Sequence, residues 1–167
     1  MARTLEYFGY GANKDPDMIG AIIGRVPDNE PAVLENYALV IQQYGQIPGE
    51  VISILGHNWS DEEVANFMTY AIRPQNGEKV PGTLWKRITS DERALIDDWE
   101  INDGLWYQKR TVEVIAGGVA LNASTEIIDD PTLPLALDVA PELPTFLNDK
   151  ARMLEVAGIL LDLANNQ

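Results

Sequence analysis

Apolar and polar residues alternate along several short segments of the chain, a spacing typical of half-buried β-strands. Aromatic and β-branched residues are common in the same segments, which predict strands over residues 4–10, 37–41, 67–72, 80–88 and 107–115. Between the third and fourth of them, Pro74-Gln75-Asn76-Gly77 predicts a turn that joins the two as a hairpin. The pair Gly117-Gly118 predicts a reversal into one further strand.

Helix signals lie between these strands. Asp15-Pro16-Asp17 combines an N-cap, a proline at the first helical position and an acid in the first turn, and predicts a short helix over residues 17–23. Thr89-Ser90, with Glu92 as a capping-box partner, predicts a second helix that runs toward Asn102.

A third helix is predicted over about residues 144–163 from apolar residues at helical spacing. Because strands and helices follow one another without regular βαβ alternation, the order favours the α+β class. We expect a small mixed β-barrel or strongly curled sheet with helices packed outside it. The length, 167 residues and 18.5 kDa, is that of one ordinary domain, so we expect a single domain over residues 1–167.

The chain is strongly acidic, with 26 acidic and 12 basic side chains and a formal net charge of −14. This charge repels phosphate backbones and anionic lipids, which argues against nucleic acid and membrane surfaces as partners. A small polar substrate fits the balance better. The oligomeric state does not follow from the sequence.

Cysteine is absent and His57 is the single histidine. This composition excludes disulfides, a thiolate nucleophile and a cysteine-rich or histidine-rich metal site, so we expect no metal. The first residues lack the apolar run of a signal peptide, and nowhere do about 18 uncharged apolar residues follow one another. We therefore expect a cytoplasmic protein.

The glycines of Gly9-Tyr10-Gly11-Ala12-Asn13 follow the first predicted strand. The segment lacks the third glycine of a dinucleotide fingerprint, and no Gly-Lys-Ser/Thr follows, so nucleotide binding is not supported. Glycines at a strand end do allow a ligand to approach backbone N–H groups, which can hold a carboxylate or a polarised carbonyl. Taken alone, the segment favours the simpler interpretation of a tight strand-to-helix turn.

Glu100 lies near the end of the second predicted helix, four residues after Ile96 and beside Trp99. Partial burial there would raise the pKa of Glu100 toward a value useful for a general base, and Asp97 would act in the same direction. The alternative is a solvated carboxylate at a helix end, and spacing alone favours that alternative.

Several short motifs nevertheless occur together and in one order. They are Tyr10-Gly11-Ala12-Asn13, Gly82-Thr83-Leu84-Trp85, Ile96-Asp97-Asp98-Trp99-Glu100 and Tyr107. The set resembles the gamma-glutamylcyclotransferase family, including the AIG2-like proteins, over Tyr7 to about Val114. Two residues depart from the family pattern, since Ala12 replaces a serine and Ile101 stands where glycine is common.

The resemblance implies a reaction in which the α-amine of a γ-glutamyl group attacks its own γ-carbonyl, closing 5-oxoproline and expelling an amine. It implies Glu100 as the general acid and base, with no metal or cofactor. The substrate-binding residues that it implies are Phe8, Gly9, Tyr10, Gly11, Ala12, Asn13 and Tyr107. Of these, Tyr107 would orient Glu100, and the loop would bind through its backbone, which the change to Ala12 preserves.

Two other function classes stay open. A ligand-binding or regulatory module that has lost turnover is favoured by Ala12 and Ile101 and opposed by Glu100. A structural or interaction domain is suggested by Trp59 and Trp106, if they are exposed.

One stretch, residues 47–66, reads as an insertion and leaves two alternatives. It could cover the site, or it could be a surface excursion that carries one small helix, and we favour the surface interpretation. For His57, a hydrogen-bonded loop side chain is favoured over a catalytic role.

Overall fold

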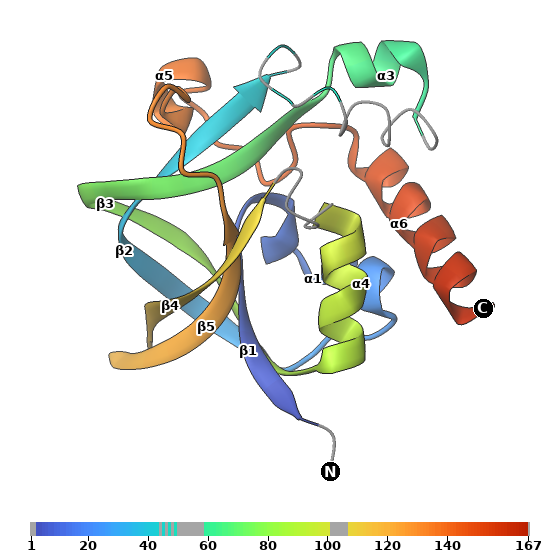
Figure 1. Cartoon of the computed structure of the whole chain (residues 1–167), viewed down its shortest axis with the longest axis horizontal. Helices are drawn as coiled ribbons and strands as arrows, with labels where there is room; N and C mark the ends of the chain where they lie inside the picture. The colour runs from blue at the N-terminus through green and yellow to red at the C-terminus, as the bar shows by residue number, and fades with distance from the viewer. Residues whose placement is uncertain are drawn as a thin grey trace.

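Five strands pair in the order β1-β3-β2-β4-β5 and close into a barrel in the computed structural model (Figure 1). The structure describes residues 3–43, 45, 47, 49, 59–100 and 107–166. The elements are β1 (Thr4–Gly9), η1 (Gly11–Lys14), α1 (Pro16–Ile23), β2 (Asn29–Gln43), α3 (Asp61–Ala65), β3 (Met68–Thr89), α4 (Ser90–Glu100), β4 (Gln108–Ala116), β5 (Val119–Ile127), α5 (Ala136–Val139) and α6 (Lys150–Asn165). The predicted α+β barrel with helices outside it is confirmed.

The predicted hairpin between residues 67–72 and 80–88 is wrong, because β3 runs through both segments as one strand. It pairs with β2 along almost its whole length, with one shift of register next to Asn36. Asn36 and Gly77 both have positive φ angles, and the Gly77 N–H donates to Asn36 Oδ1 at 3.2 Å. The turn-forming residues therefore make a bulge within a continuing strand pair.

The predicted starts of two helices and the predicted glycine turn are confirmed. The Asp15 side chain accepts hydrogen bonds from the Asp17 and Met18 N–H groups at the start of α1. Thr89 and Glu92 exchange side-chain and backbone hydrogen bonds at the start of α4. At Gly117-Gly118, φ angles of 57° and 78° form the tight reversal between β4 and β5.

The carboxy-terminal helix begins later than predicted, at Lys150 rather than near residue 144. Its N-cap is Asp149, whose side chain accepts a hydrogen bond from the Arg152 N–H at 2.8 Å. The apolar residues Phe146 and Leu147 lie before the helix and pack on two different core clusters. Helical spacing did not distinguish them from the helix that follows.

Because side chains alternate along the strands, neighbouring residues of one strand pack into different apolar clusters. Phe8 of β1 packs inside the barrel with Leu84 of β3, whereas Tyr7 belongs to the core between the barrel and the helices. Helices α1, α4 and α6 lie together on one side of the barrel (Figure 1). The candidate site lies between these helices and the barrel.

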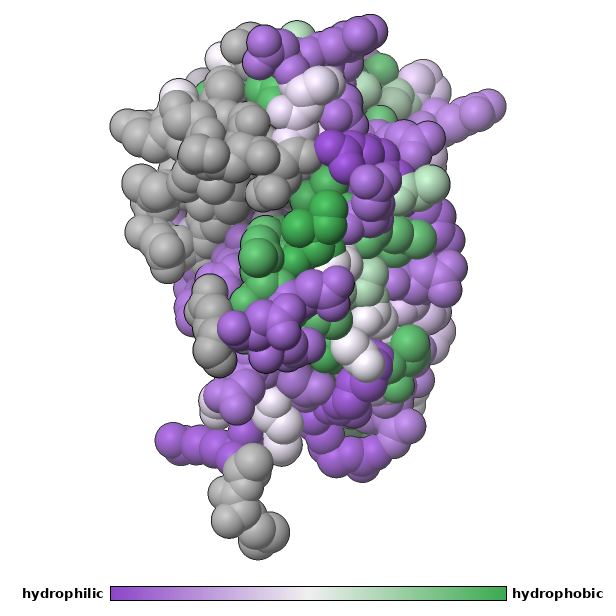
Figure 2. All heavy atoms as spheres, turned by 90° about the vertical axis from the view of Figure 1, so that its right-hand side faces the viewer, coloured by the Kyte–Doolittle hydropathy of each residue, from purple (hydrophilic) through white to green (hydrophobic). Residues whose placement is uncertain are grey.

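Helix α6 leaves part of its apolar surface uncovered. Ile159 and Leu163 are exposed on it, and Figure 2 shows an apolar strip, bordered by hydrophilic side chains, on this face of the molecule. In the described ranges, no helix has the length and apolar character that crossing a membrane requires.

We expect Gly82→Ala to lower the free energy of unfolding by about 1–3 kcal/mol, as overpacking does in well-packed cores. A Cβ at Gly82 would lie 2.5 Å from the carbonyl oxygen of Gly9 and 2.5 Å from the Phe8 ring. Urea titration measures the loss. Gly158→Ala is the control, since a Cβ there meets open space and alanine favours the helix by roughly 1 kcal/mol. Equal stability of Gly82→Ala and the wild type would contradict the close contact of β1 and β3.

Candidate functional site

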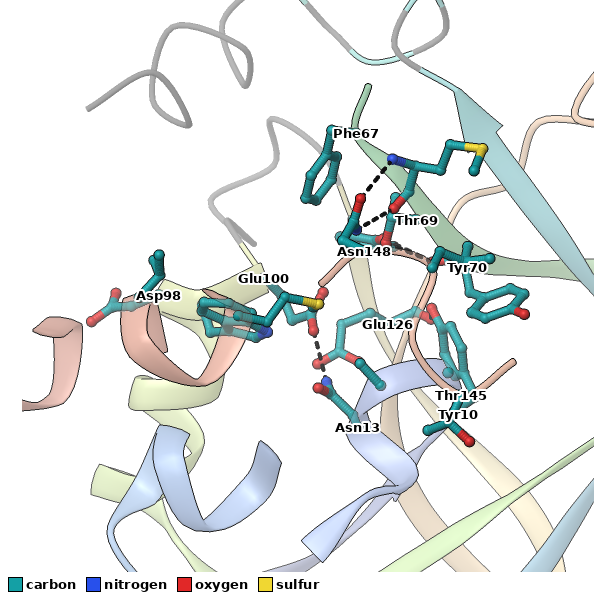
Figure 3. A pocket seen from close by; sticks show the side chains of 18 of the residues that line it. Tyr10, Asn13, Phe67, Thr69, Tyr70, Asp98, Glu100, Glu126, Thr145 and Asn148 are labelled. Carbon is teal, nitrogen blue, oxygen red and sulfur yellow. Dashed lines mark hydrogen bonds between the residues drawn. The ribbon is translucent and has the colours of Figure 1, made fainter. Parts of the chain in front are cut away.

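A cavity of about 130 Å³ lies between the segment after β1, the start of β3, the end of α4 and helix α6. Tyr10, Gly11, Ala12 and Asn13 line one wall, and Glu100 lines another. Figure 3 shows Asn13 and Glu100 facing each other, with the Asn13 Nδ2 donating to Glu100 Oε1 at 2.7 Å. The structure thus brings the loop and the carboxylate, which lie far apart in the sequence, to one cavity.

The wall after β1 is the short 3₁₀ helix η1, held in place by β3. Trp85 Nε1 donates to the Asn13 carbonyl oxygen at 2.8 Å, and a Cβ at Gly9 would lie 2.3 Å from that same oxygen. Within the described part of the chain, the amide N–H groups of Gly11 and Ala12 have no acceptor, as expected at the first turn of a helix. Two donors are therefore available in residues that line the cavity.

A chain of hydrogen bonds continues from Glu100 into the protein. Asn13 Nδ2 also donates to the Tyr7 hydroxyl at 2.9 Å, and that hydroxyl donates to Glu126 Oε2 at 2.9 Å. Arg93 Nη1 donates to Glu126 Oε1 at 2.8 Å, forming a buried ion pair in which Arg93 is 4% and Glu126 2% exposed. The side-chain amide nitrogen of Asn13 and the hydroxyl of Tyr7 thus connect Glu100 with Glu126.

Burial raises the pKa of Glu100 from its ordinary range to about 8, and the negative charge of Glu126 adds to the effect. The hydrogen bond from Asn13 and the positive charge of Arg93 oppose it. The sequence led us to expect that Asp97 would help to raise the pKa of Glu100. In the structure, the carboxylate that does so is Glu126. Asp97 instead pairs with Arg93 at 3.2 Å and with Lys109 at 2.9 Å.

Three residues of the site, Glu126, Arg93 and Tyr7, were not predicted from the sequence. Glu126 shares alternate positions of β5 with the polar residues Asn122 and Ser124, so it looks like a solvent-facing position of an ordinary strand. It enters the site because β1 and β5 pair in parallel, with Tyr7 opposite Ser124. No signal within β5 alone indicates that pairing.

The remaining predicted binding residues are placed differently. Tyr107 lines the cavity, and its hydroxyl donates to the Tyr70 carbonyl oxygen at 2.9 Å. Phe8 and Gly9 do not line the cavity, because the Phe8 ring is buried inside the barrel and Gly9 packs against the Asn13 carbonyl. In a strand, successive side chains point to opposite faces, so Tyr7 occupies the position toward the site in place of Phe8.

The surface interpretation of residues 47–66 is wrong for two residues that the structure describes. Ile47 and Trp59 are buried in the core beside the helices, and Trp59 also lines the cavity and packs edge-on against Phe67. Trp59 is therefore not an exposed interaction residue, while the expected small helix is α3. Four residues that the sequence analysis mentions, His57, Ile101, Asn102 and Trp106, lie outside the described residues.

No group of three or more histidine, aspartate or glutamate side chains in the described ranges is arranged to hold a metal ion. Among the described residues that line it, the cavity offers carboxyl groups, amide N–H groups and the hydroxyls of tyrosine and threonine. Burial raises the pKa of Tyr7, Tyr10 and Tyr107, so these hydroxyls remain protonated donors near neutral pH.

The sequence model of the family Gamma-glutamyl cyclotransferase, AIG2-like, matches residues 7–141, which include the loop, Glu100 and Glu126. The chain belongs to this family. AIG2-like protein C of Arabidopsis thaliana is 26% identical over 133 residues, which are 77% of this chain. The chain spans 63% of the length of that relative.

Solved structures share the AIG2-like fold at low sequence identity. A structure titled gamma-glutamyl cyclotransferase has a TM-score of 0.58 and 18% identity, covering 78% of this chain and 70% of that one. A solution structure from Arabidopsis thaliana has a TM-score of 0.57 and 20% identity, covering 81% of this chain and 79% of that one. An uncharacterized human protein has a TM-score of 0.58 and 17% identity, covering 78% and 69%.

Proposed function

We propose that the protein is a gamma-glutamyl cyclotransferase that releases 5-oxoproline and a free amine from a γ-glutamyl amide. One observation carries the proposal, which is that Glu100, a carboxyl group of raised pKa, shares a cavity with the amides of Gly11 and Ala12, which have no acceptor among the described residues. Membership of the family supports the same reaction.

In the proposed reaction the substrate α-nitrogen forms a bond to its own γ-carbonyl carbon, and the bond from that carbon to the departing nitrogen breaks. Glu100 takes one proton from the substrate ammonium before the attack, and it takes a second from the α-nitrogen as the ring closes. It passes each proton in turn to the departing nitrogen, which leaves as an ammonium ion, so no proton is gained or lost overall. Both reacting groups belong to one molecule, and the protein therefore acts by holding the folded conformer and moving protons.

The Gly11 and Ala12 amides would donate to the γ-carbonyl oxygen as negative charge develops on it. Asn13 fixes the carboxyl group, because its donation to Glu100 Oε1 leaves Oε2 to exchange protons with the substrate. Tyr10 and Tyr107 complete the wall around the substrate. Phe8 and Gly9 have no part in this proposal.

The test is a panel of γ-glutamyl amino acids, peptides and alkyl amides, with 5-oxoproline measured by chromatography. Release from at least one compound is the expected result. Binding of such compounds without any release would favour the ligand-binding module instead.

The pH dependence of kcat/KM should reflect the pKa of Glu100 in the free enzyme. Glu100 must be deprotonated to accept the substrate proton, so we expect kcat/KM to rise with pH up to about 8. Because the charge of Glu126 raises the pKa of Glu100, Glu126→Gln should move this rising limb of the kcat/KM profile to lower pH. Glu142→Gln, at an exposed site away from the cavity, is the control. A limb that stays in place in Glu126→Gln would contradict the assignment.

A further inference from the structure

Helix α6 lies outside the part of the chain that the family model matches, residues 7–141, yet it forms one wall of the cavity. Met153, Val156 and Leu160 provide this wall, and they recur every three or four residues on one face of the helix. Trp59 and Phe67 extend the same apolar surface. The polar groups used in the proposed reaction come from other elements, η1 and α4.

The charged side chains that line the cavity are all acidic. Asp98, Glu100 and Glu126 line it, and no lysine or arginine does so among the described residues. All twelve lysines and arginines of the chain lie in the described ranges, so the remaining residues supply no further one. An anionic group on the substrate, beyond the glutamyl part, would have no such cation to pair with.

The two cations of helix α6 are already paired with carboxylates. Arg152 lies over the Trp59 ring and pairs with Glu63 at 2.7 Å. Lys150 pairs with Asp15 and Asp17 at 3.3 and 3.0 Å. Moving either of them into the cavity would break these pairs.

We infer that α6 is the specificity element of the site. It selects a γ-glutamyl amide whose departing nitrogen carries an apolar, uncharged substituent, such as an alkyl chain. This inference rests on the proposed function. The glutamyl part uses the amides of η1 and Glu100, and the departing amine lies against Met153, Val156 and Leu160. A charged end on that amine would lose its hydration against an apolar wall.

Three probes of matched length test the inference on the wild-type protein: the γ-glutamyl amides of hexylamine, 6-aminohexanoic acid and 1,6-diaminohexane. They present a methyl, a carboxylate and an ammonium group at the far end. We expect kcat/KM for the hexylamide to exceed that for each charged probe by about tenfold or more, with the carboxylate probe the poorest. Equal values, or a preference for either charged probe, would overturn the inference.

Calorimetric binding to Glu100→Gln separates this inference from the reaction. If the hexylamide binds most tightly to Glu100→Gln but the wild type releases 5-oxoproline from no probe, the proposed reaction fails and the inferred specificity stands. If the three probes bind equally, the specificity fails whatever the turnover.

A charge placed on the wall should change the preference. Leu160→Lys is expected to weaken use of the hexylamide and improve use of the carboxylate probe, each by about tenfold, because a lysine can extend its charge along an apolar surface. Ile159→Lys adds the same charge to an exposed position of the same helix and should leave the preference unchanged. The same change of preference in both variants would contradict the role of the wall.

Discussion

Glu100→Gln is expected to lower kcat for 5-oxoproline release by about 10²–10⁴-fold, the usual effect of losing a positioned acid–base group. Glutamine keeps the shape of the side chain and can still accept the hydrogen bond from Asn13, but it cannot carry a proton between two nitrogens. Substrate affinity should therefore change little, which calorimetry can measure beside the steady-state kinetics.

Asp97→Asn is the matched control, since it removes the same charge from the same helix. Asp97 does not line the cavity and pairs with Arg93 and Lys109, so we expect kcat to change by less than about tenfold. Equal rates for the wild type and Glu100→Gln would contradict the proposed mechanism.

Glu126→Leu is expected to lower the free energy of unfolding by about 3–5 kcal/mol, because it leaves a buried charge without its buried partner. Among the described residues, Arg93 would keep only the part-exposed Asp97 as an ionic partner. Urea titration measures the loss.

The double variant Arg93→Met/Glu126→Leu should regain most of that stability, since apolar residues of similar volume often replace a buried ion pair at little cost. A strong coupling in the double-mutant cycle is therefore expected. If the losses of the two single variants simply add, the ion pair is not the source of the effect.

Sequence predicted the features whose causes lie within a few residues of one another. Asp15 and Pro16 fix the start of α1, and the capping box of Thr89 and Glu92 fixes the start of α4. The glycine pair before β5 is recognised in the same way, because its positive φ angles are a local requirement.

Long-range pairing explains what sequence did not predict. Pro74 and Gly77 are strong turn signals, but β3 remains paired with β2 on both sides of them, so they make a bulge and not a reversal. Glu126 has no local signal, because its role depends on β5 lying beside β1. Glu100 was proposed from its motif, whereas its partners became known only from the structure.

The parallel pairing of β1 with β5 also has a consequence for the order in which the protein folds. The contacts Tyr7–Glu126, Tyr10–Glu126 and Thr125–Phe8 join residues that are 116 to 119 positions apart along the chain. Closing so long a loop costs chain entropy that few contacts offset until the other strands are paired. Tyr7 lines the cavity and also lies where β1 pairs with β5 to close the barrel. A folding intermediate in which every helix and hairpin has formed, but β1 and β5 are not yet paired, therefore lacks a complete site.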